Sequence, residues 1–147
     1  MLYSELAYEI AKQAHMGQKD KAGVDYIHHP ETVASMMETD IEKSVAYLHD
    51  VVEDTTITLE MLKAKGFSNE VINAVNAITK RAGEEYNEYL HRVAENPIAF
   101  KVKLADMKHN SNLNRFENPT SENVEKAKSY KRKIQDLKKI YEKHTNH

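Results

Sequence analysis

The sequence contains no cysteine among its 147 residues, and it has only four glycines and three prolines. Without cysteine the protein has neither disulfide bonds nor thiolate metal sites, so any metal must be bound by His, Asp, Glu, Asn or backbone oxygens. Glycine and proline rarely interrupt the chain, and runs of alternating apolar and polar residues are scarce. The composition therefore predicts an all-α fold.

A strong charge of one sign and a long hydrophobic run are also missing. The net charge is -2 and the pI is near 6.4, which gives no general attraction to nucleic acid or to an anionic membrane. No apolar run approaches the roughly 20 residues that cross a bilayer, and the amphipathic, partly acidic N-terminus is unlike a signal peptide. We expect a single cytoplasmic domain over residues 1–147 that binds a small molecule, and neither nucleic acid nor a membrane. A homo-oligomer is left open.

Apolar residues at steps of three and four predict a series of helices separated by polar breaks. The longest break covers residues 17–28, which carry two glycines and strong charge. Its length of about 12 residues suggests a functional loop. The helices are predicted over residues 2–15, a segment opened by Pro30, and residues 41–54, 58–66, 68–80, 86–95, 98–113 and 122–144.

One nine-residue stretch, residues 47–55, combines a histidine with three carboxylates and a small apolar stripe. On the predicted helix His49 and Glu53 share one face, while Asp50 and Asp54 share the adjacent face. Carboxylates beside an apolar stripe are costly to bury, so they are normally paired, protonated or bound to a metal. The same pattern also fits a solvated charged edge, and the stretch alone does not decide between the two.

Two further positions extend this pattern. Asp106 follows two apolar residues in a predicted helix and shares a face with Asn110. A structural alternative is that Asp106 caps a neighbouring helix and Asn110 satisfies a backbone carbonyl. A helical bundle can bring His29, the His49–Asp50 pair and Asp106 together on one cation. Two imidazoles and two carboxylates leave room for water on an octahedral ion such as Mn²⁺, whereas they would nearly close a tetrahedral Zn²⁺ site.

Taken in order, these motifs resemble those of the metal-dependent HD phosphohydrolases, and more closely their RelA/SpoT-type alarmone hydrolase branch. The matching stretches are H-x-G-Q at residues 15–18, Y-I-H-H-P at 26–30, L-H-D-V-V-E-D-T at 48–55, T-K at 79–80 and K-L-A-D-x-x-x-N at 103–110. The resemblance implies an all-α HD-domain bundle. It also implies a stand-alone hydrolase that removes the 3′-pyrophosphate of (p)ppGpp.

The resemblance further implies roles for individual residues, within a metal-site core at about residues 11–115 that a packing helix at about 122–144 follows. The implied ligands of Mn²⁺, or of another divalent cation, are His29, His49, Asp50 and Asp106. The implied catalytic residues, which position or deprotonate the attacking water, are Glu53 and Asp54. The implied substrate-binding residues are Lys21, Tyr26, Lys103 and Asn110. His15 is expected to form a hydrogen bond near the first loop, and no role is expected for the other histidines, His109 among them.

The sequence departs from the family pattern at positions where the family is expected to contact the nucleotide. Asp20 stands where an arginine that meets the guanine base is usual, and Asp25 replaces a proline. Met107 and Leu113 likewise replace a usual arginine and a usual threonine. Loss of a planar cation that stacks on a base removes a contact of about 1 kcal/mol or more. The reaction type is therefore better supported than the substrate.

Three other functions fit parts of the pattern. The same metal site can serve a phosphohydrolase with another nucleotide or phosphate ester as its substrate, which the residues at positions 20 and 107 favour. A metal-stabilised module that binds a nucleotide without turnover has no need of Glu53 and Asp54. A non-enzymatic helical interaction protein has no need of the converging histidines and carboxylates.

Overall fold

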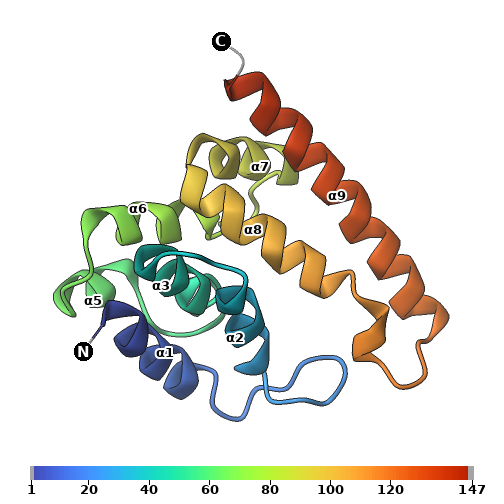
Figure 1. Cartoon of the computed structure of the whole chain (residues 1–147), viewed down its shortest axis with the longest axis horizontal. Helices are drawn as coiled ribbons and strands as arrows, with labels where there is room; N and C mark the ends of the chain where they lie inside the picture. The colour runs from blue at the N-terminus through green and yellow to red at the C-terminus, as the bar shows by residue number, and fades with distance from the viewer. Residues whose placement is uncertain (1, 146–147) are drawn as a thin grey trace.

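A computed structural model describes residues 2–145, and over this range the chain is helical with no β-strand. The all-α prediction is confirmed. Figure 1 shows the helices in chain order, with the first loop between α1 and α2. The elements are α1 (Tyr3–Ala14), α2 (His28–Ser35), α3 (Asp40–Leu48), α4 (Val51–Asp54), α5 (Leu59–Ala64), α6 (Asn69–Ile78), α7 (Tyr86–Glu95), α8 (Pro97–Asn110), the 3-10 helix η1 (Leu113–Arg115) and α9 (Ser121–Thr145).

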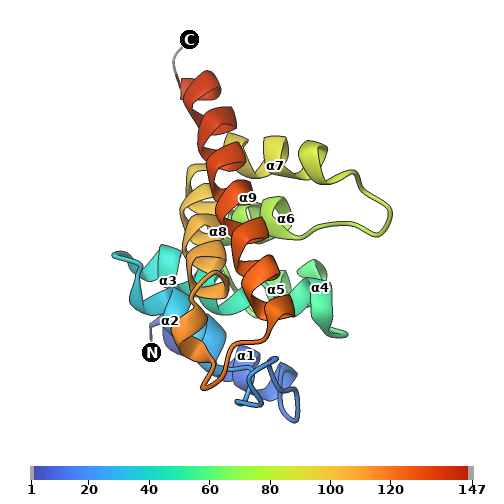
Figure 2. The same ribbon diagram turned by 90° about the vertical axis from the view of Figure 1, so that its right-hand side faces the viewer.

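The helices pack in two groups that meet at α8. In the N-terminal group α1 and α2 pack on α3, which also contacts α6 and α8. In the C-terminal group α9 runs beside α8 and α7, as Figures 1 and 2 both show. Apolar side chains fill the space between them and are almost fully buried, among them Val33, Leu48, Val75, Val102 and Leu137. Both α2 and α3 contact α8, so residues far apart in sequence face each other across one core.

Side-chain caps fix where the two longest site-bearing helices begin. At the start of α3 the Thr39 hydroxyl accepts the N–H of Glu42 at 3.1 Å, and the Glu42 carboxylate accepts the N–H of Thr39 at 3.2 Å. At the start of α8 the Asn96 carbonyl oxygen accepts the N–H groups of Ile98 and Ala99. Such caps satisfy amides that the first helical turn leaves without partners. They set the register of α3 and α8.

The helix predicted over residues 41–54 is interrupted, which corrects the sequence-based expectation. Helix α3 ends at Leu48, His49 and Asp50 form a turn, and a separate short helix α4 begins at Val51. The His49 ring donates from Nδ1 to the carbonyl oxygen of Ala46 at 2.6 Å. In a continuous helix this carbonyl would instead accept the backbone N–H of Asp50, four residues later. His49 and Glu53 therefore do not share one helical face.

The other helix boundaries follow the sequence prediction with small changes. The helix predicted to end at about residue 113 ends at Asn110, because Asn112 caps a new 3-10 turn by accepting the N–H of Asn114 at 2.9 Å. The long C-terminal helix is present as α9. Within the described residues, no helix is both long and apolar enough to span a membrane.

Candidate metal centre and adjoining cavity

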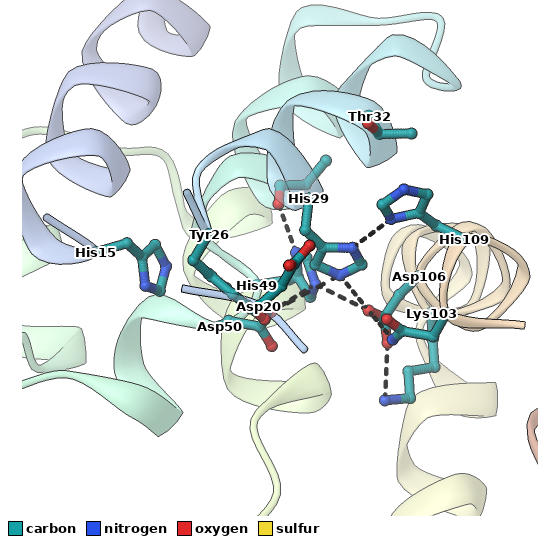
Figure 3. A network of polar contacts seen from close by, with 12 residues as sticks. His15, Asp20, Tyr26, His29, Thr32, His49, Asp50, Lys103, Asp106 and His109 are labelled. Carbon is teal, nitrogen blue, oxygen red and sulfur yellow. Dashed lines mark hydrogen bonds and ion pairs between the residues drawn. The ribbon is translucent and has the colours of Figure 1, made fainter. Parts of the chain in front are cut away.

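Two helices and one turn bring four predicted residues together in the interior. His29 comes from the first turn of α2, His49 and Asp50 from the turn between α3 and α4, and Asp106 from the middle of α8. One ligand atom from each lies within 4.8 Å of the others. His29, His49 and Asp106 are buried, and Asp50 is partly buried. Figure 3 shows the four side chains pointing toward one another.

Short contacts join the imidazole rings to the carboxylates. His29 Nε2 lies 2.7 Å from Asp106 Oδ1, and His49 Nε2 lies 3.0 Å from Asp50 Oδ2 and 3.3 Å from Asp106 Oδ1. Burial alone would lower the pKa of His49, but the charges of Asp50 and Asp106 raise it well above its ordinary value. The pocket between these atoms is thus electrostatically suited to a positive charge, which a proton or a metal cation can supply.

In both His29 and His49 the outer ring nitrogen, Nδ1, has a partner outside the cluster. These partners orient the rings so that the inner nitrogen, Nε2, faces the cluster. His49 Nδ1 donates to the carbonyl oxygen of Ala46, which leaves the lone pair of neutral His49 on Nε2. His29 Nδ1 lies 2.6 Å from Nδ1 of His109, and the two rings are nearly coplanar and meet edge to edge, with centroids 4.9 Å apart. Burial, His29 and Arg115 lower the pKa of His109 to about 4, so near neutral pH His109 is uncharged and can accept an N–H from His29. This arrangement is typical of metal-binding histidines, and the donor set fits a divalent cation.

Three further side chains hold the carboxylates of the cluster. Lys103 donates to Asp106 Oδ2 at 3.1 Å, and the Asn110 amide donates to Asp106 Oδ1 at 3.2 Å. The Tyr26 hydroxyl donates to Asp50 Oδ2. Burial and the Asp50 carboxylate raise the pKa of Tyr26, which keeps the hydroxyl protonated as a donor. Three of the four expected substrate-binding residues therefore contact the cluster directly: Lys103 and Asn110 orient Asp106, and Tyr26 orients Asp50.

Glu53 and Asp54 lie on α4, directly after the turn that carries His49 and Asp50, and both are exposed. The Glu53 carboxylate accepts the backbone N–H of Lys80 at 2.7 Å, which ties α4 to the end of α6. Partial burial and the charges of Asp50 and Glu53 raise the pKa of Asp54 to about 6. A carboxylate with such a pKa can exchange a proton near neutral pH, which general acid–base chemistry requires.

A cavity of about 370 Å³ adjoins the cluster. Its volume falls in the range of small-molecule sites. His29 and Tyr26 lie at its border with the cluster, and the first loop, η1 and α9 supply the rest of its wall. The lining residues are Lys19, Asp20, Lys21, Tyr26, His29, Asn110, Arg115, Phe116, Asn123, Lys126 and Tyr130.

Comparisons with known proteins show that most of the chain is similar in sequence to one part of several (p)ppGpp enzymes. It is 37% identical over 112 residues to a guanosine-3′,5′-bis(diphosphate) 3′-pyrophosphohydrolase of Aquifex aeolicus, an alignment that covers 68% of this chain and 16% of the relative. It is 33% identical over 119 residues to the bifunctional (p)ppGpp synthase/hydrolase SpoT of Escherichia coli, covering 71% of this chain and 17% of the relative. The chain thus spans about one sixth of the curated relatives that it matches.

A solved structure of similar size has the same all-α fold as this chain. The chain matches it with a TM-score of 0.71 and 22% identity, over 98% of this chain and 96% of the other. That structure is described as a metazoan ortholog of SpoT that hydrolyses ppGpp and plays a role in starvation responses. The chain therefore shares the fold of that protein over nearly its whole length. No protein-family model matches it.

The structure also contains features that the sequence did not reveal. His109, for which no role was expected, contacts His29 through the ring nitrogens. Arg115, Phe116 and Lys126 line the cavity, although they lie in the connection after α8 and in α9. No motif marked these residues, because their position depends on how η1 and α9 pack against the first loop. His15 forms its expected contact, with Nδ1 3.0 Å from the side-chain oxygen of Gln18.

Proposed function

We propose that this chain is a divalent-metal-dependent phosphohydrolase that removes the 3′-pyrophosphate of (p)ppGpp. The observation that carries the proposal is the convergence of two histidines and two aspartates beside a cavity whose wall holds three lysines, Lys19, Lys21 and Lys126, and an ion pair between Arg115 and Asp20. A polyphosphorylated nucleotide matches such a wall in charge. The similarity to curated (p)ppGpp hydrolases supports the same substrate.

His29, His49, Asp50 and Asp106 would hold the cation, and Mn²⁺ is the ion we propose, because two imidazoles and two carboxylates leave room for water on an octahedral ion. Bound there, a divalent cation lowers the pKa of a water molecule and neutralises charge on the phosphoryl oxygens. The protein keeps the ligands in place through contacts already present. His109 and Ala46 accept from the outer imidazole nitrogens, while Lys103 and Tyr26 hold the carboxylates.

Glu53 and Asp54 would position the attacking water and take its proton. A carboxylate accepts the proton as the water oxygen forms a bond to phosphorus and the bond from phosphorus to the ribose 3′-oxygen breaks. The 3′-oxygen leaves with a proton, so the products are pyrophosphate and GDP or GTP. The raised pKa of Asp54, about 6, suits this acceptor role. The bond from Lys80 to Glu53 would keep α4 close to the end of α6 during the reaction.

Steady-state hydrolysis of ppGpp by the Mn²⁺-loaded protein tests the proposal, with the products separated by chromatography. Release of GDP and pyrophosphate, lost in Glu53→Ala, is the expected result. If the metal-loaded protein does not hydrolyse ppGpp but hydrolyses another nucleotide or phosphate ester from a panel, the metal chemistry stands and the substrate is wrong. Tight binding of ppGpp without turnover of any substrate in the panel would indicate a nucleotide-binding module.

A further inference from the structure

The cavity wall contains an arginine beside Asn110 that no motif predicted. Arg115 ends η1, and its guanidinium carbon lies 5.5 Å from the ring centroid of Phe116. Both residues line the cavity, which reaches the cluster at His29. Arg115 is mostly buried, with a side-chain exposure of 15%. A guanidinium held beside an aromatic ring in the wall of a ligand cavity is suited to bind a planar ligand.

The protein already occupies much of the in-plane bonding capacity of this guanidinium. Nη2 donates to Asp20 Oδ2 at 3.3 Å, while Nη1 donates to the carbonyl oxygen of His109 at 3.5 Å and to the side-chain oxygen of Asn110 at 3.4 Å. Three of the roughly five N–H groups that an arginine carries are thereby used, and its charge is paired with a carboxylate. Because Phe116 lies against the guanidinium, the face turned away from Phe116, rather than the edge, is the recognition surface that we infer.

Asp20 is itself held rigidly by the first loop. Its Oδ1 accepts the backbone N–H groups of Ala22 at 2.8 Å and Val24 at 3.0 Å, which leaves Oδ2 for Arg115. Burial alone would raise the pKa of Asp20, but the two backbone donors and Arg115 lower it below its ordinary value. Asp20 is therefore ionised at neutral pH, and it joins the first loop to η1 across the cavity.

We propose that Arg115 is the platform on which the nucleobase of the substrate stacks, and that Asp20 is the positioning residue that fixes its orientation. The proposal rests on the proposed function, because it assigns the base of the same nucleotide whose pyrophosphate reaches the metal centre. It also accounts for the aspartate at position 20. The planar cation at this cavity is Arg115 from η1, and the first loop supplies its counter-ion, Asp20.

A phosphate group is the less suitable partner for Arg115. A phosphate binds an arginine best through two parallel in-plane N–H groups, and Asp20 already competes for that edge. The lysines that line the same cavity, among them Lys21 and Lys126, are more exposed and can meet phosphates without displacing a carboxylate. A base that stacks on the guanidinium face disturbs none of the three hydrogen bonds.

Ligand binding to the Mn²⁺-loaded Glu53→Gln protein separates these possibilities by calorimetry. In this background Arg115→Met should raise the Kd for ppGpp about tenfold. Arg115→Lys should raise it nearly as much, because lysine keeps the charge but has no planar face. The Kd for inorganic pyrophosphate, a probe without a base, should stay within about twofold in both variants. With Glu53 restored, KM for ppGpp should rise while kcat stays close to wild type.

Asp20→Asn tests the positioning role with little change to the loop, since an asparagine Oδ1 can still accept from Ala22 and Val24. We expect a rise in Kd for ppGpp of about threefold. The double variant Asp20→Asn/Arg115→Met should bind ppGpp no worse than Arg115→Met alone, because Asp20 acts through Arg115. Additive losses would overturn the positioning role of Asp20.

The result that overturns the platform is a change of less than twofold in the Kd for ppGpp in Arg115→Met, or rescue by Arg115→Lys. An equal loss of pyrophosphate affinity, or a fall in thermal midpoint that accounts for the loss, would also overturn it. If the wild-type protein does not turn over ppGpp while its binding still depends on Arg115, the proposed function fails and this inference stands. If ppGpp is hydrolysed with an unchanged KM in Arg115→Met, this inference alone fails.

Discussion

The buried cluster and the cavity beside it differ in how firmly their side chains are held. In the cluster, contacts of 2.7 to 3.3 Å join His29 and His49 to aspartates, and His49, for example, is only 3% exposed. In the cavity, Lys21 and Lys126 are exposed, and the bonds of Arg115 are 3.3 to 3.5 Å long. A preorganised cluster fixes the chemistry, whereas a looser wall can change its ligand without disturbing that chemistry. Substitutions at the cluster should therefore lower kcat, whereas substitutions in the cavity wall should raise KM.

Removal of a cluster ligand should have the largest effect. We expect Asp106→Ala or His49→Ala to lower kcat/KM for ppGpp by on the order of a thousandfold or more, because the cation contributes several kcal/mol to the transition state. Bound metal, measured by elemental analysis, should be lost as well. His28→Ala is the matched control, since His28 neighbours His29 but its side chain is 61% exposed. Full activity of Asp106→Ala would show that the cluster is not the reaction centre.

The carboxylates of α4 should affect turnover without loss of metal. Glu53→Gln and Asp54→Asn are expected to lower kcat on the order of a hundredfold or more, as for other general acid–base groups. Glu60→Gln on α5 is a control at an exposed carboxylate. If metal content falls in step with kcat, the two residues support the cluster and do not act on the water.

The pH profile gives a second measurement on α4. The pKa of Asp54 is raised to about 6 by partial burial, Asp50 and Glu53. A carboxylate accepts a proton only when ionised, so kcat should rise as the pH increases through about 6. The rise should disappear in Asp54→Asn. A profile that keeps its shape in this variant would assign the titration to another group.

The contact between His29 and His109 should affect metal affinity. His109→Phe keeps an aromatic ring at this position but removes the nitrogen that accepts from His29. We expect Kd for Mn²⁺ to rise about tenfold or more, as is usual when the outer partner of a ligating histidine is removed. Competition with a chelator measures this change. Unchanged affinity would mean that the ring contact serves packing alone.

The cavity lysines should give the smallest effect. Lys21→Met is expected to raise KM for ppGpp up to about fivefold at low ionic strength, with little change in kcat. Salt should reduce this difference, because the charge is exposed. Lys63→Met on α5 is the control. A large fall in kcat in Lys21→Met would contradict the view that the cluster sets kcat and the cavity wall sets KM.

The sequence predicted the helices and the four cluster residues well, because both depend on short patterns. His49 and Asp50 are adjacent, and the apolar spacing around them indicates a buried helix. The remaining contacts depend on packing between distant segments. His29 and His109 are 80 residues apart, and Asp20 and Arg115 are 95 residues apart. No local pattern specifies such pairs. No local pattern specifies the break between α3 and α4 either, where the His49 ring donates to the carbonyl oxygen of Ala46.

That break has a consequence for how the chain tolerates change. Neighbouring residues on a continuous helix point about 100° apart, so their side chains converge on one point less readily than they do from a turn. His49 and Asp50 converge from the turn that follows the end of α3 at Leu48. Insertion or deletion of one residue at this turn would rotate one of the two side chains out of the cluster, even if every packing contact of α3 survived. The length of the backbone between Leu48 and Val51 should therefore vary less among functional variants than the side chains that surround it.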